Sequence, residues 1–454
     1  MKASLLLGLI LFANWPTALA QVALEPGEFY FRVAGRPAFI FGRNPTGTRL
    51  EQFDELLRPA AESGETILRI HLTVGFQSQS PAGDVDEAWA AQWERVFDSA
   101  AAKGLHVLPV LGVWADWNDG SNGEPWHQWD KNRYNAARGG PAKTPAELFQ
   151  DSNCQRLWLA WLESLVKRWQ ARANILGWEI FSELDLVSGS SETKALPFVE
   201  RAAQVIRKAD SRHRPVTASL SGVGEWPKLF AGSALDVIQV HPYTDSRFHR
   251  NLDDLILSSV RARLQRYGKP VFIGECGLDP IGTRDGLANA PRAHVGIRHA
   301  IWAAAVSGAM NGRMLWWEDG YDRYQQLDLR AKYAHAARAA ADFVRGVNFT
   351  GFRPVVVSCS ADLKGAAIGG KETVLVWVRE ARCEPPDWNV RRVERQHVTL
   401  DLPGSKQNWA VEFYDPVSAR PISKLPIQRG SDRATIALPP FEDAIALKAT
   451  AGGT

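Results

Sequence analysis

The sequence has few cysteines and no long apolar run beyond its N-terminal segment, and these shortages exclude several kinds of protein. Its four cysteines, Cys154, Cys276, Cys359 and Cys383, are too few and too scattered for a disulfide scaffold or a zinc site. An exported chain can still form a bridge, and Cys359 with Cys383 is the pair we expect. No segment after the N-terminal one is apolar for long enough to span a membrane.

The chain also lacks an excess of charge of either sign. It carries 53 basic and 50 acidic residues, for a formal net charge of +3. A nucleic-acid-binding protein has a basic excess, so this class is excluded. The sequence has no Gly-rich phosphate loop after an early strand, which argues against an open doubly wound sheet. It likewise shows no motif for a cofactor or a metal, since His294 and His299 are off the spacing of helical zinc ligands.

The first 20 residues have the pattern of a secretory signal peptide. Lys2 supplies an early positive charge, an apolar run follows over Leu5–Ala13, and Ala18-Leu19-Ala20 has small residues at its first and third positions. We expect cleavage after Ala20, which leaves a secreted or periplasmic chain. An uncleaved anchor is the alternative, although the apolar run is short for a membrane span.

Short apolar runs alternate with longer amphipathic segments from residue 36 to about 345. Apolar strands that alternate with amphipathic helices indicate a parallel sheet covered by helices. Eight such units over about 310 residues fit a closed (β/α)8 barrel. The strand-like runs are Pro37–Phe41, Thr66–Leu72, His106–Val113, Ile175–Phe181, Pro215–Leu220, Asp236–Val240, Pro270–Gly274 and Arg313–Trp317.

The pattern changes after Asn348, where short strands separated by clusters of Gly, Pro, Asp and Ser predict an antiparallel β-sandwich. We therefore expect a signal peptide over 1–20, a catalytic barrel over 21–348 and an accessory β-sandwich over 349–454. Because no low-complexity linker intervenes, the two folded parts are expected to pack directly. The sandwich is expected to support the barrel without joining in catalysis, and the protein to be a monomer.

Two glutamates stand at the ends of expected strands on opposite sides of the barrel. Glu183 ends the fourth strand, and Glu275 ends the seventh. The C-terminal ends of barrel strands build the active site, so the two carboxylates are expected to face each other across its mouth. Double-displacement glycoside hydrolysis needs such a pair, with one carboxyl protonated and the other ionised. The alternative is that each Glu is a structural salt-bridge partner.

Polar residues on neighbouring strands strengthen this pair. His241 and Tyr243 are two residues apart, so on an extended strand they point the same way, toward Glu275. A Tyr hydroxyl that donates to the nucleophile keeps it ionised and oriented. Arg69 lies inside an apolar strand and needs a carboxylate partner. Glu275 is the partner we expect, and Glu179 is the alternative.

Further candidates for substrate binding are mostly aromatic. His71 lies at the end of the strand that carries Arg69, and Trp316 ends the eighth strand, where it is expected to face inward instead of Trp317. Four more tryptophans gather in a Gly- and Asp-rich loop after the third strand, as a stacking wall for sugars or as a small core under the loop. They are Trp114, Trp117, Trp126 and Trp129, of which Trp114 and Trp117 are the substrate-binding candidates.

This set of residues resembles the clan of retaining barrel glycosidases, and glycoside hydrolase family 5 most of all. The resemblance covers about residues 25–345, and the C-terminal region resembles the β-sandwich often appended in these enzymes. It implies that Glu183 is the acid/base, that Glu275 is the nucleophile and that the partner is a glycan. The residues that carry it are Arg69, Glu183, His241, Tyr243, Glu275 and Trp316.

One position departs from the clan. Asn usually precedes the acid/base Glu and donates to the sugar 2-hydroxyl, whereas this chain has Ser182. We expect Ser182 at the rim of the pocket, where it changes how the substrate is contacted. The leading prediction is a secreted retaining β-glycosidase, endo-acting on a polysaccharide, with no cofactor. The alternatives are a catalytically weak carbohydrate-binding barrel and a glycan-remodelling transglycosylase.

Overall fold

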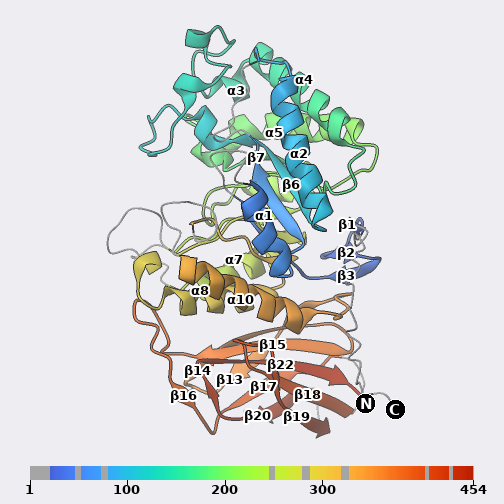
Figure 1. Cartoon of the computed structure of the whole chain (residues 1–454), viewed down its shortest axis with the longest axis vertical. Helices are drawn as coiled ribbons and strands as arrows, with labels where there is room; N and C mark the ends of the chain where they lie inside the picture. Colours follow the sequence, from blue (N-terminus) through green and yellow to red (C-terminus); the bar gives the residue numbers. More distant parts are fainter. Residues whose placement is uncertain are drawn as a thin grey trace, which may run out of the picture.

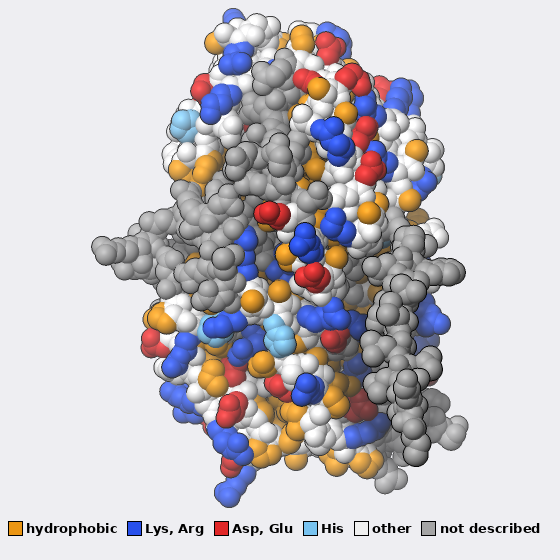
Figure 2. All heavy atoms as spheres, viewed as in Figure 1, with side chains coloured by type: hydrophobic (Ala, Val, Ile, Leu, Met, Phe, Trp, Pro, Cys, Tyr) orange, Lys and Arg blue, Asp and Glu red, His pale blue; other side chains and the backbone are white. Residues whose placement is uncertain are grey.

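The computed structural model describes residues 21–45, 53–72, 80–244, 251–278, 287–317, 327–403, 408–428 and 433–452. The expected signal peptide lies outside these ranges. Figure 1 shows a helix-rich part in the upper region of the view and a strand-rich C-terminal part below it. Figure 2 shows basic and acidic side chains interspersed on the same face, in keeping with the near balance of charge.

Parallel strands form the barrel. Two backbone hydrogen bonds, from Asp236 N to Val216 O and from Cys276 N to Met314 O, join a two-stranded pair to both edges of a six-stranded sheet and so close the ring. The predicted barrel with a C-terminal β-sandwich is thus confirmed. The six strands follow the order β11 (Asn311–Arg313), β4 (Ile40–Arg43), β5 (Ile67–His71), β6 (His106–Val113), β7 (Trp178–Ser182) and β8 (Val216–Thr217), and the pair is β9 (Ile238–Val240) with β10 (Val271–Ile273).

Some strands are shorter than the apolar runs that predicted them. The eighth run was expected over Arg313–Trp317, but β11 ends at Arg313. Arg313 and Met314 have φ of +64° and +60°, a left-handed conformation that breaks the extended backbone. The chain therefore turns before the two tryptophans, Trp316 and Trp317, and neither lies on a strand.

Amphipathic helices cover the outside of the ring. Asp86 precedes α2 and accepts a hydrogen bond from Trp89 N at 3.0 Å, which satisfies one of the free N–H groups at the start of the helix. Three short strands, β1 (Val22–Ala23), β2 (Phe31–Val33) and β3 (Arg36–Ala38), form a separate small sheet before the barrel. The helices are α1 (Phe53–Glu62), α2 (Glu87–Ala102), α3 (Glu147–Gln150), α4 (Ser152–Trp169), α5 (Glu192–Ala209), α6 (Pro227–Ala231), α7 (Leu252–Tyr267), α8 (Ala293–Ala305) and α10 (Leu327–Val344).

The C-terminal strands form antiparallel sheets that enclose a core of their own. Val376 and Val411 from the largest sheet and Val398 and Ile436 from a smaller one are all buried in that core. The largest sheet has the order β12 (Arg353–Val355), β14 (Leu363–Gly369), β15 (Thr373–Glu380), β22 (Ala444–Ala451), β18 (Asn408–Tyr414) and β19 (Pro421–Gln428). The smaller ones are β13 (Val357–Cys359), β17 (His397–Asp401) and β20 (Arg433–Ala437), and β16 (Arg392–Val393) with β21 (Phe441–Glu442).

The largest of these sheets packs directly against the barrel helices α8 and α10, as Figure 1 shows. Trp377 on β15 shares one apolar core with Trp302 on α8 and Phe343 on α10. A buried ion pair, Arg379 to Asp253 at 2.6 Å, crosses the same boundary. Apolar contact and paired charge together hold the two parts against each other.

The expected Cys359–Cys383 disulfide is wrong, because all four cysteines are free. The thiol of Cys383 lies near Asp443 at the boundary with the barrel, whereas that of Cys359 lies against Gly365 on β14. The two thiols thus belong to different surroundings within the β-sandwich. Within the part of the chain that the structure describes, no helix is long and apolar enough to cross a membrane.

Candidate active site

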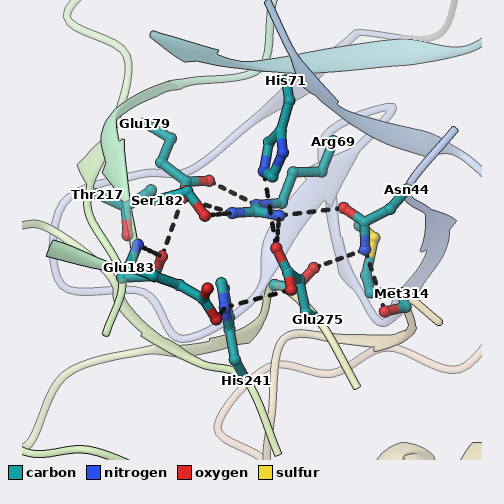
Figure 3. A network of polar contacts seen from close by, with 12 residues as sticks. Asn44, Arg69, His71, Glu179, Ser182, Glu183, Thr217, His241, Glu275 and Met314 are labelled. Atoms are coloured by element: carbon teal, nitrogen blue, oxygen red, sulfur yellow. Dashed lines mark hydrogen bonds and ion pairs between the residues drawn. The ribbon is translucent and has the colours of Figure 1, made fainter. Parts of the chain in front are cut away.

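Two carboxylates meet at the C-terminal ends of the barrel strands (Figure 3). Glu183 directly follows β7, and Glu275 lies two residues beyond β10. An oxygen of each and a ring nitrogen of His241 all lie within 4.8 Å of one another. Glu183 is 8% exposed and Glu275 4%. This close approach of two carboxylate oxygens agrees with the separation of about 5–5.5 Å between the carboxyl groups of retaining glycosidases.

The backbone of Glu183 is held in a conformation that non-glycine residues avoid. Its φ of +57° and ψ of +59° lie in the left-handed region, at a cost on the order of 1–3 kcal/mol that the surroundings must offset. Ser219 does so from the neighbouring chain segment, because its hydroxyl accepts from Glu183 N at 3.0 Å and its carbonyl accepts from Leu184 N at 3.1 Å. The turn ends β7 and directs the Glu183 side chain toward His241.

Arg69 is a fully buried cation that links the carboxylates of this site. It donates through NH1 to Glu275 Oε1 at 2.7 Å and through Nε and NH2 to both oxygens of Glu179, also at 2.7 Å. Both carboxylates that the sequence offered as partners are therefore used. Coulombic attraction to Glu179 and Glu275 outweighs burial and raises the pKa of Arg69, so it stays charged.

We expect Ser182 at the pocket rim from the sequence, but the structure shows that it is fully buried. Its hydroxyl accepts a hydrogen bond from Arg69 NH2 at 2.9 Å. A serine hydroxyl lies close to its own backbone, so it stays at the level of the guanidinium and behind the carboxylates. Figure 3 shows Ser182 beside Glu179 and Arg69.

The two catalytic candidates differ in the donors that reach them. Glu275 accepts from Arg69 at Oε1 and from the Tyr243 hydroxyl at Oε2, each at 2.7 Å. Glu183 has Nδ1 of His241 at 2.9 Å from its Oε1, while the same nitrogen is 3.6 Å from Glu275 Oε2. Donors to a carboxylate favour its ionised form. The contacts therefore favour an ionised Glu275.

Burial raises the pKa of both carboxyls, and it does so most clearly for Glu183. Desolvation, followed by the charge of Asp185, raises the pKa of Glu183 to about 8. Desolvation also raises the pKa of Glu275, but Arg69 and the Tyr243 hydroxyl act against it. At neutral pH Glu183 is therefore protonated, as an acid/base residue requires.

His71 and Trp316 border Glu275 on its other side. Nε2 of His71 is 3.7 Å from Glu275 Oε1, and neither ring nitrogen has a hydrogen-bond partner among the described residues. Burial and the nearby Arg69 hold the pKa of His71 well below its usual value, so the ring is neutral. The Trp316 ring lies 4.8 Å from the His71 ring, centroid to centroid. Both side chains are thus placed beside the carboxylate that would attack the sugar.

The four tryptophans of the loop after β6 fall into two groups. Trp117 is only 3% exposed and packs against Trp129 and Tyr134, with ring centroids 5.5 and 5.2 Å away. The 3-10 helix over Trp114–Trp117 turns Trp117 into this small core under the loop. Trp117 therefore lies in the small core under the loop, which is the alternative that the sequence left open.

The other two tryptophans of this loop stay partly exposed. Trp114 and Trp126 pack against the same small apolar cluster at the end of β6. Trp126 also lies 5.5 Å from Trp317, whose ring is 6.3 Å from that of Tyr243. Trp317 thus joins the site as well as Trp316, contrary to the prediction that only one faces inward, because neither is on a strand.

Two polar residues of this region, Asn44 and Gln239, were not among the site residues that the sequence predicted. Asn44 directly follows β4, donates to the carbonyls of Gly274 and Met314 at 2.9 and 3.1 Å, and accepts from Arg69 NH1 at 3.2 Å. Gln239 is buried on β9, two residues before His241. Each had a signal, since a polar residue that ends or interrupts an apolar barrel strand points to the site.

Comparison with known proteins agrees with this geometry. A family model described as Cellulase (glycosyl hydrolase family 5) matches residues 43–308. No curated protein matches the chain. Among solved structures, a glycoside hydrolase family 5 protein from Bacteroides vulgatus is 12% identical with a TM-score of 0.63, over 96% of this chain and 94% of that one.

Two further solved structures are similar in fold. An endo-1,4-beta-mannanase from Rhizomucor miehei is 16% identical with a TM-score of 0.53, over 71% of this chain and 100% of that one. A glycoside hydrolase family 30 subfamily 8 xylanase from Clostridium acetobutylicum is 13% identical with a TM-score of 0.55, over 92% and 97%. At such identities the likeness is one of fold.

Proposed function

The chain belongs to glycosyl hydrolase family 5, and from that premise we propose that it is a secreted β-glycosidase that cleaves polysaccharides at internal bonds, with Glu183 as acid/base and Glu275 as nucleophile. The family model matches more than half of the sequence, so the protein is a retaining O-glycosyl hydrolase with a carbohydrate substrate. This confirms the resemblance to the family. The two roles rest on the unequal donors to the two carboxylates.

The proposed reaction has two displacements. Glu275 attacks the anomeric carbon and forms a glycosyl ester, while Glu183 gives its proton to the glycosidic oxygen and the alcohol leaves. Glu183, now ionised, removes a proton from a water molecule. The water oxygen then attacks the same carbon and releases Glu275 as a carboxylate. Two inversions give net retention, and Glu183 ends protonated as it began.

The aromatic residues around the carboxylates support the binding of several sugar units. Trp316 borders Glu275, while Trp317 and Trp126 continue beyond Tyr243 with ring spacings of 6.3 and 5.5 Å. Flat rings stack on the apolar faces of sugars. A row of partly exposed rings that leads away from Tyr243 extends past a single sugar, which favours a chain as substrate and an internal bond as the point of cleavage.

Export is the remaining part of the proposal. It is supported by the signal-peptide pattern over residues 1–20. Gln21 already takes part in the fold, because its carbonyl accepts from Ala34 N at 2.9 Å. N-terminal sequencing of the protein recovered from outside the host cytoplasm should begin at Gln21, and an unprocessed N-terminus would count against export.

A polysaccharide panel tests the substrate and the mode of action. Cellulose, β-1,4-mannan and xylan come first, since the family model and two structural neighbours are named for enzymes acting on them. Internal cleavage lowers viscosity steeply for few new reducing ends, and release of single sugars without a fall in viscosity would refute it. Longer oligosaccharides as main products would indicate glycan transfer in place of hydrolysis.

The roles are tested with Glu275→Ala and Glu183→Ala on an aryl glycoside with a good leaving group. Glu275→Ala should lose activity by several orders of magnitude, and azide should restore turnover with inverted product. Glu183→Ala should lose far less on this substrate than on one with a poor leaving group, because only the latter needs protonation. Near-normal activity of Glu275→Ala, or equal losses for Glu183→Ala on both substrates, would reject the assignments.

A further inference from the structure

Gln239 is a polar residue in the barrel interior, on the same strand as His241. It is 1% exposed, and neither its amide oxygen nor its amide nitrogen has a hydrogen-bond partner among the residues that the structure describes. Nε2 of the fully buried His241 likewise has no hydrogen-bond partner among these residues. Leaving a buried polar group unsatisfied costs about 1–3 kcal/mol. Three such atoms so close to the catalytic carboxylates call for a functional explanation.

Gly274, the residue before Glu275, shows that Gln239 and His241 converge on one point. A Cβ at Gly274 would lie 2.0 Å from Gln239 Oε1 and 2.7 Å from His241 Nε2. Both distances are shorter than any real contact, so only glycine lets the two side chains occupy this space. It follows that Gln239 Oε1 and His241 Nε2 are at most about 4.7 Å apart, the sum of the two distances.

One bridging water fits the upper end of this range. Two hydrogen bonds of about 2.8 Å that meet at a tetrahedral angle span roughly 4.6 Å. Buried waters typically sit where polar groups lack protein partners, and they make about three hydrogen bonds each. Gln239 offers an acceptor and a donor here, and His241 offers Nε2. The carbonyl oxygen is the amide atom that faces the glycine, so the amide is placed to accept.

We propose that Gln239 is a positioning residue that accepts, through one buried water, a hydrogen bond from Nε2–H of His241, and so fixes the tautomer in which Nδ1 accepts the proton of Glu183. Nδ1 is 2.9 Å from Glu183 Oε1, on the edge of the ring away from Nε2. The inference rests on the acid/base role proposed for Glu183. The inference adds Gln239, which acts on Glu183 through His241, to the residues of the site.

Proton accounting requires this tautomer. A neutral imidazole carries one N–H, and a protonated Glu183 can donate to Nδ1 only if that hydrogen is on Nε2. Burial lowers the pKa of His241 to about 4, with Arg69 acting in the same direction, while Glu275, Glu179 and Asp185 oppose it. The ring is therefore neutral at the pH where Glu183 acts as an acid.

The same tautomer also serves the second displacement. After Glu183 has given its proton to the leaving group, its carboxylate faces a bare Nδ1 with no hydrogen to donate. A carboxylate without that donor is a stronger base toward the incoming water. The opposite tautomer would place Nδ1–H against the carboxylate and stabilise its ionised form, so that less of Glu183 would carry a proton at neutral pH and its carboxylate would be a weaker base.

The first experiment observes the tautomer directly and needs no activity. The full-length protein, with 15N-labelled histidine, is studied by long-range 1H–15N correlation, and the His241 signals are identified by their loss in His241→Gln. Hydrogen on Nε2 at pH 6–7 is the expected result. Hydrogen on Nδ1 in the wild-type protein overturns the proposal, whatever is found about the role of Glu183.

The second experiment varies position 239. Gln239→Met keeps the length but removes the acceptor, whereas Gln239→Glu retains an acceptor. In Gln239→Met the alkaline limb of kcat/KM should move to lower pH, because Nδ1–H then favours ionised Glu183. Its kcat/KM should fall about tenfold or more with a poor leaving group and little with a good one. In Gln239→Glu the limb should stay at or above its wild-type position.

A matched control separates catalysis from packing. Gln155→Met removes another largely buried glutamine. Gln155 lies on α4, in the outer layer of helices, and accepts a hydrogen bond from Arg201. It should lower thermal stability without moving the pH profile. A Gln239→Met enzyme with an unshifted alkaline limb, or a Gln239→Glu enzyme whose limb falls as far as that of Gln239→Met, contradicts the proposal.

Discussion

His299 on α8 and Asp443 in the β-sandwich are joined by a 2.8 Å contact between Nε2 and Oδ1, and Arg298 pairs with the other oxygen of the same carboxylate. Asp443 is buried, and its φ of +64° is left-handed. His299 and Arg298 hold the pKa of Asp443 well below its usual value, against the effect of burial. One carboxylate of the sandwich thus pairs with an arginine and a histidine of the barrel at their boundary.

Asp443→Asn should destabilise the protein by about 2–4 kcal/mol, because it leaves the partly buried Arg298 without its counter-ion. Asn tolerates a left-handed backbone, so the change removes the charge without adding strain. Thermal unfolding at neutral pH measures the loss. Asp342→Asn, which removes an exposed partner of Arg345, is the control and should have an effect below about 1 kcal/mol. An equally mild effect of Asp443→Asn would show that the boundary does not depend on this charge.

The boundary also predicts the behaviour of a chain that ends at residue 348. Such a chain exposes apolar side chains of α8 and α10, among them Trp302 and Phe343, that the sandwich covers. An exposed apolar surface of this kind favours aggregation. We expect low soluble yield, measured by size-exclusion chromatography against the full chain. A soluble barrel with full activity would mean that the sandwich is dispensable.

The titration of Glu183 makes a prediction about stability. A carboxyl whose pKa is raised in the folded protein, here to about 8, binds its proton more tightly folded than unfolded. Its stabilising contribution is complete below the unfolded pKa near 4.5 and is lost as the pH rises through 8. A Gln side chain does not titrate, so Glu183→Gln removes this loss of stability with rising pH. Its melting temperature relative to the wild type should therefore rise between pH 5 and pH 8, and a constant difference would show that Glu183 is ionised in the folded protein.

Tyr243→Phe should raise the pKa of the nucleophile. The hydroxyl donates to Glu275 Oε2 at 2.7 Å and opposes the effect of burial on that carboxyl. Without it, the acidic limb of kcat/KM should move to higher pH, and the rate should fall by roughly ten- to hundredfold. The pH profile on an activated aryl glycoside measures both. An unchanged acidic limb would assign the ionisation of Glu275 to Arg69 alone.

The sequence predicted the parts of this site that depend on strand order. Apolar runs located the ends of the strands and so placed Glu183 and Glu275 opposite each other. The depth of each side chain could not be predicted, because it depends on local turns. The left-handed backbone of Glu183 and the turn after Arg313 decide how far Ser182 and Trp317 are from the substrate. No periodicity in the sequence records such turns.

The same limit applies to the tryptophans of the loop after β6 and to the cysteines. Composition alone indicated that four indoles are hard to bury together, and the structure buries two of them under the loop and leaves two partly exposed. Trp114 and Trp117 are the first and last residues of one 3-10 helix, and only Trp117 is buried by it. The spacing of Cys359 and Cys383 likewise did not indicate which strands their thiols would face.

The burial of Ser182 changes what is expected of Ser182→Asn. At a pocket rim, Asn would alter substrate preference and leave folding intact. Ser182 is instead fully buried against Arg69, and its hydroxyl accepts at 2.9 Å from the cation that also holds Glu179 and Glu275. Asn is larger by two non-hydrogen atoms, which must displace the guanidinium or shift β7. Overpacking of this kind costs typically about 1–3 kcal/mol.

We therefore expect Ser182→Asn to lower both the melting temperature and kcat, with KM less affected, because a displaced Arg69 no longer orients Glu275. Ser182→Ala is the matched variant: it removes the acceptor without adding volume, and should cost about 0.5–1.5 kcal/mol of stability for the lost hydrogen bond. Calorimetry and steady-state kinetics on one substrate compare the three proteins. A Ser182→Asn enzyme that is as stable as the wild type and differs only in its preferred sugar would contradict this. It would show that an Asn side chain at this position reaches the substrate, although the Ser182 side chain is buried.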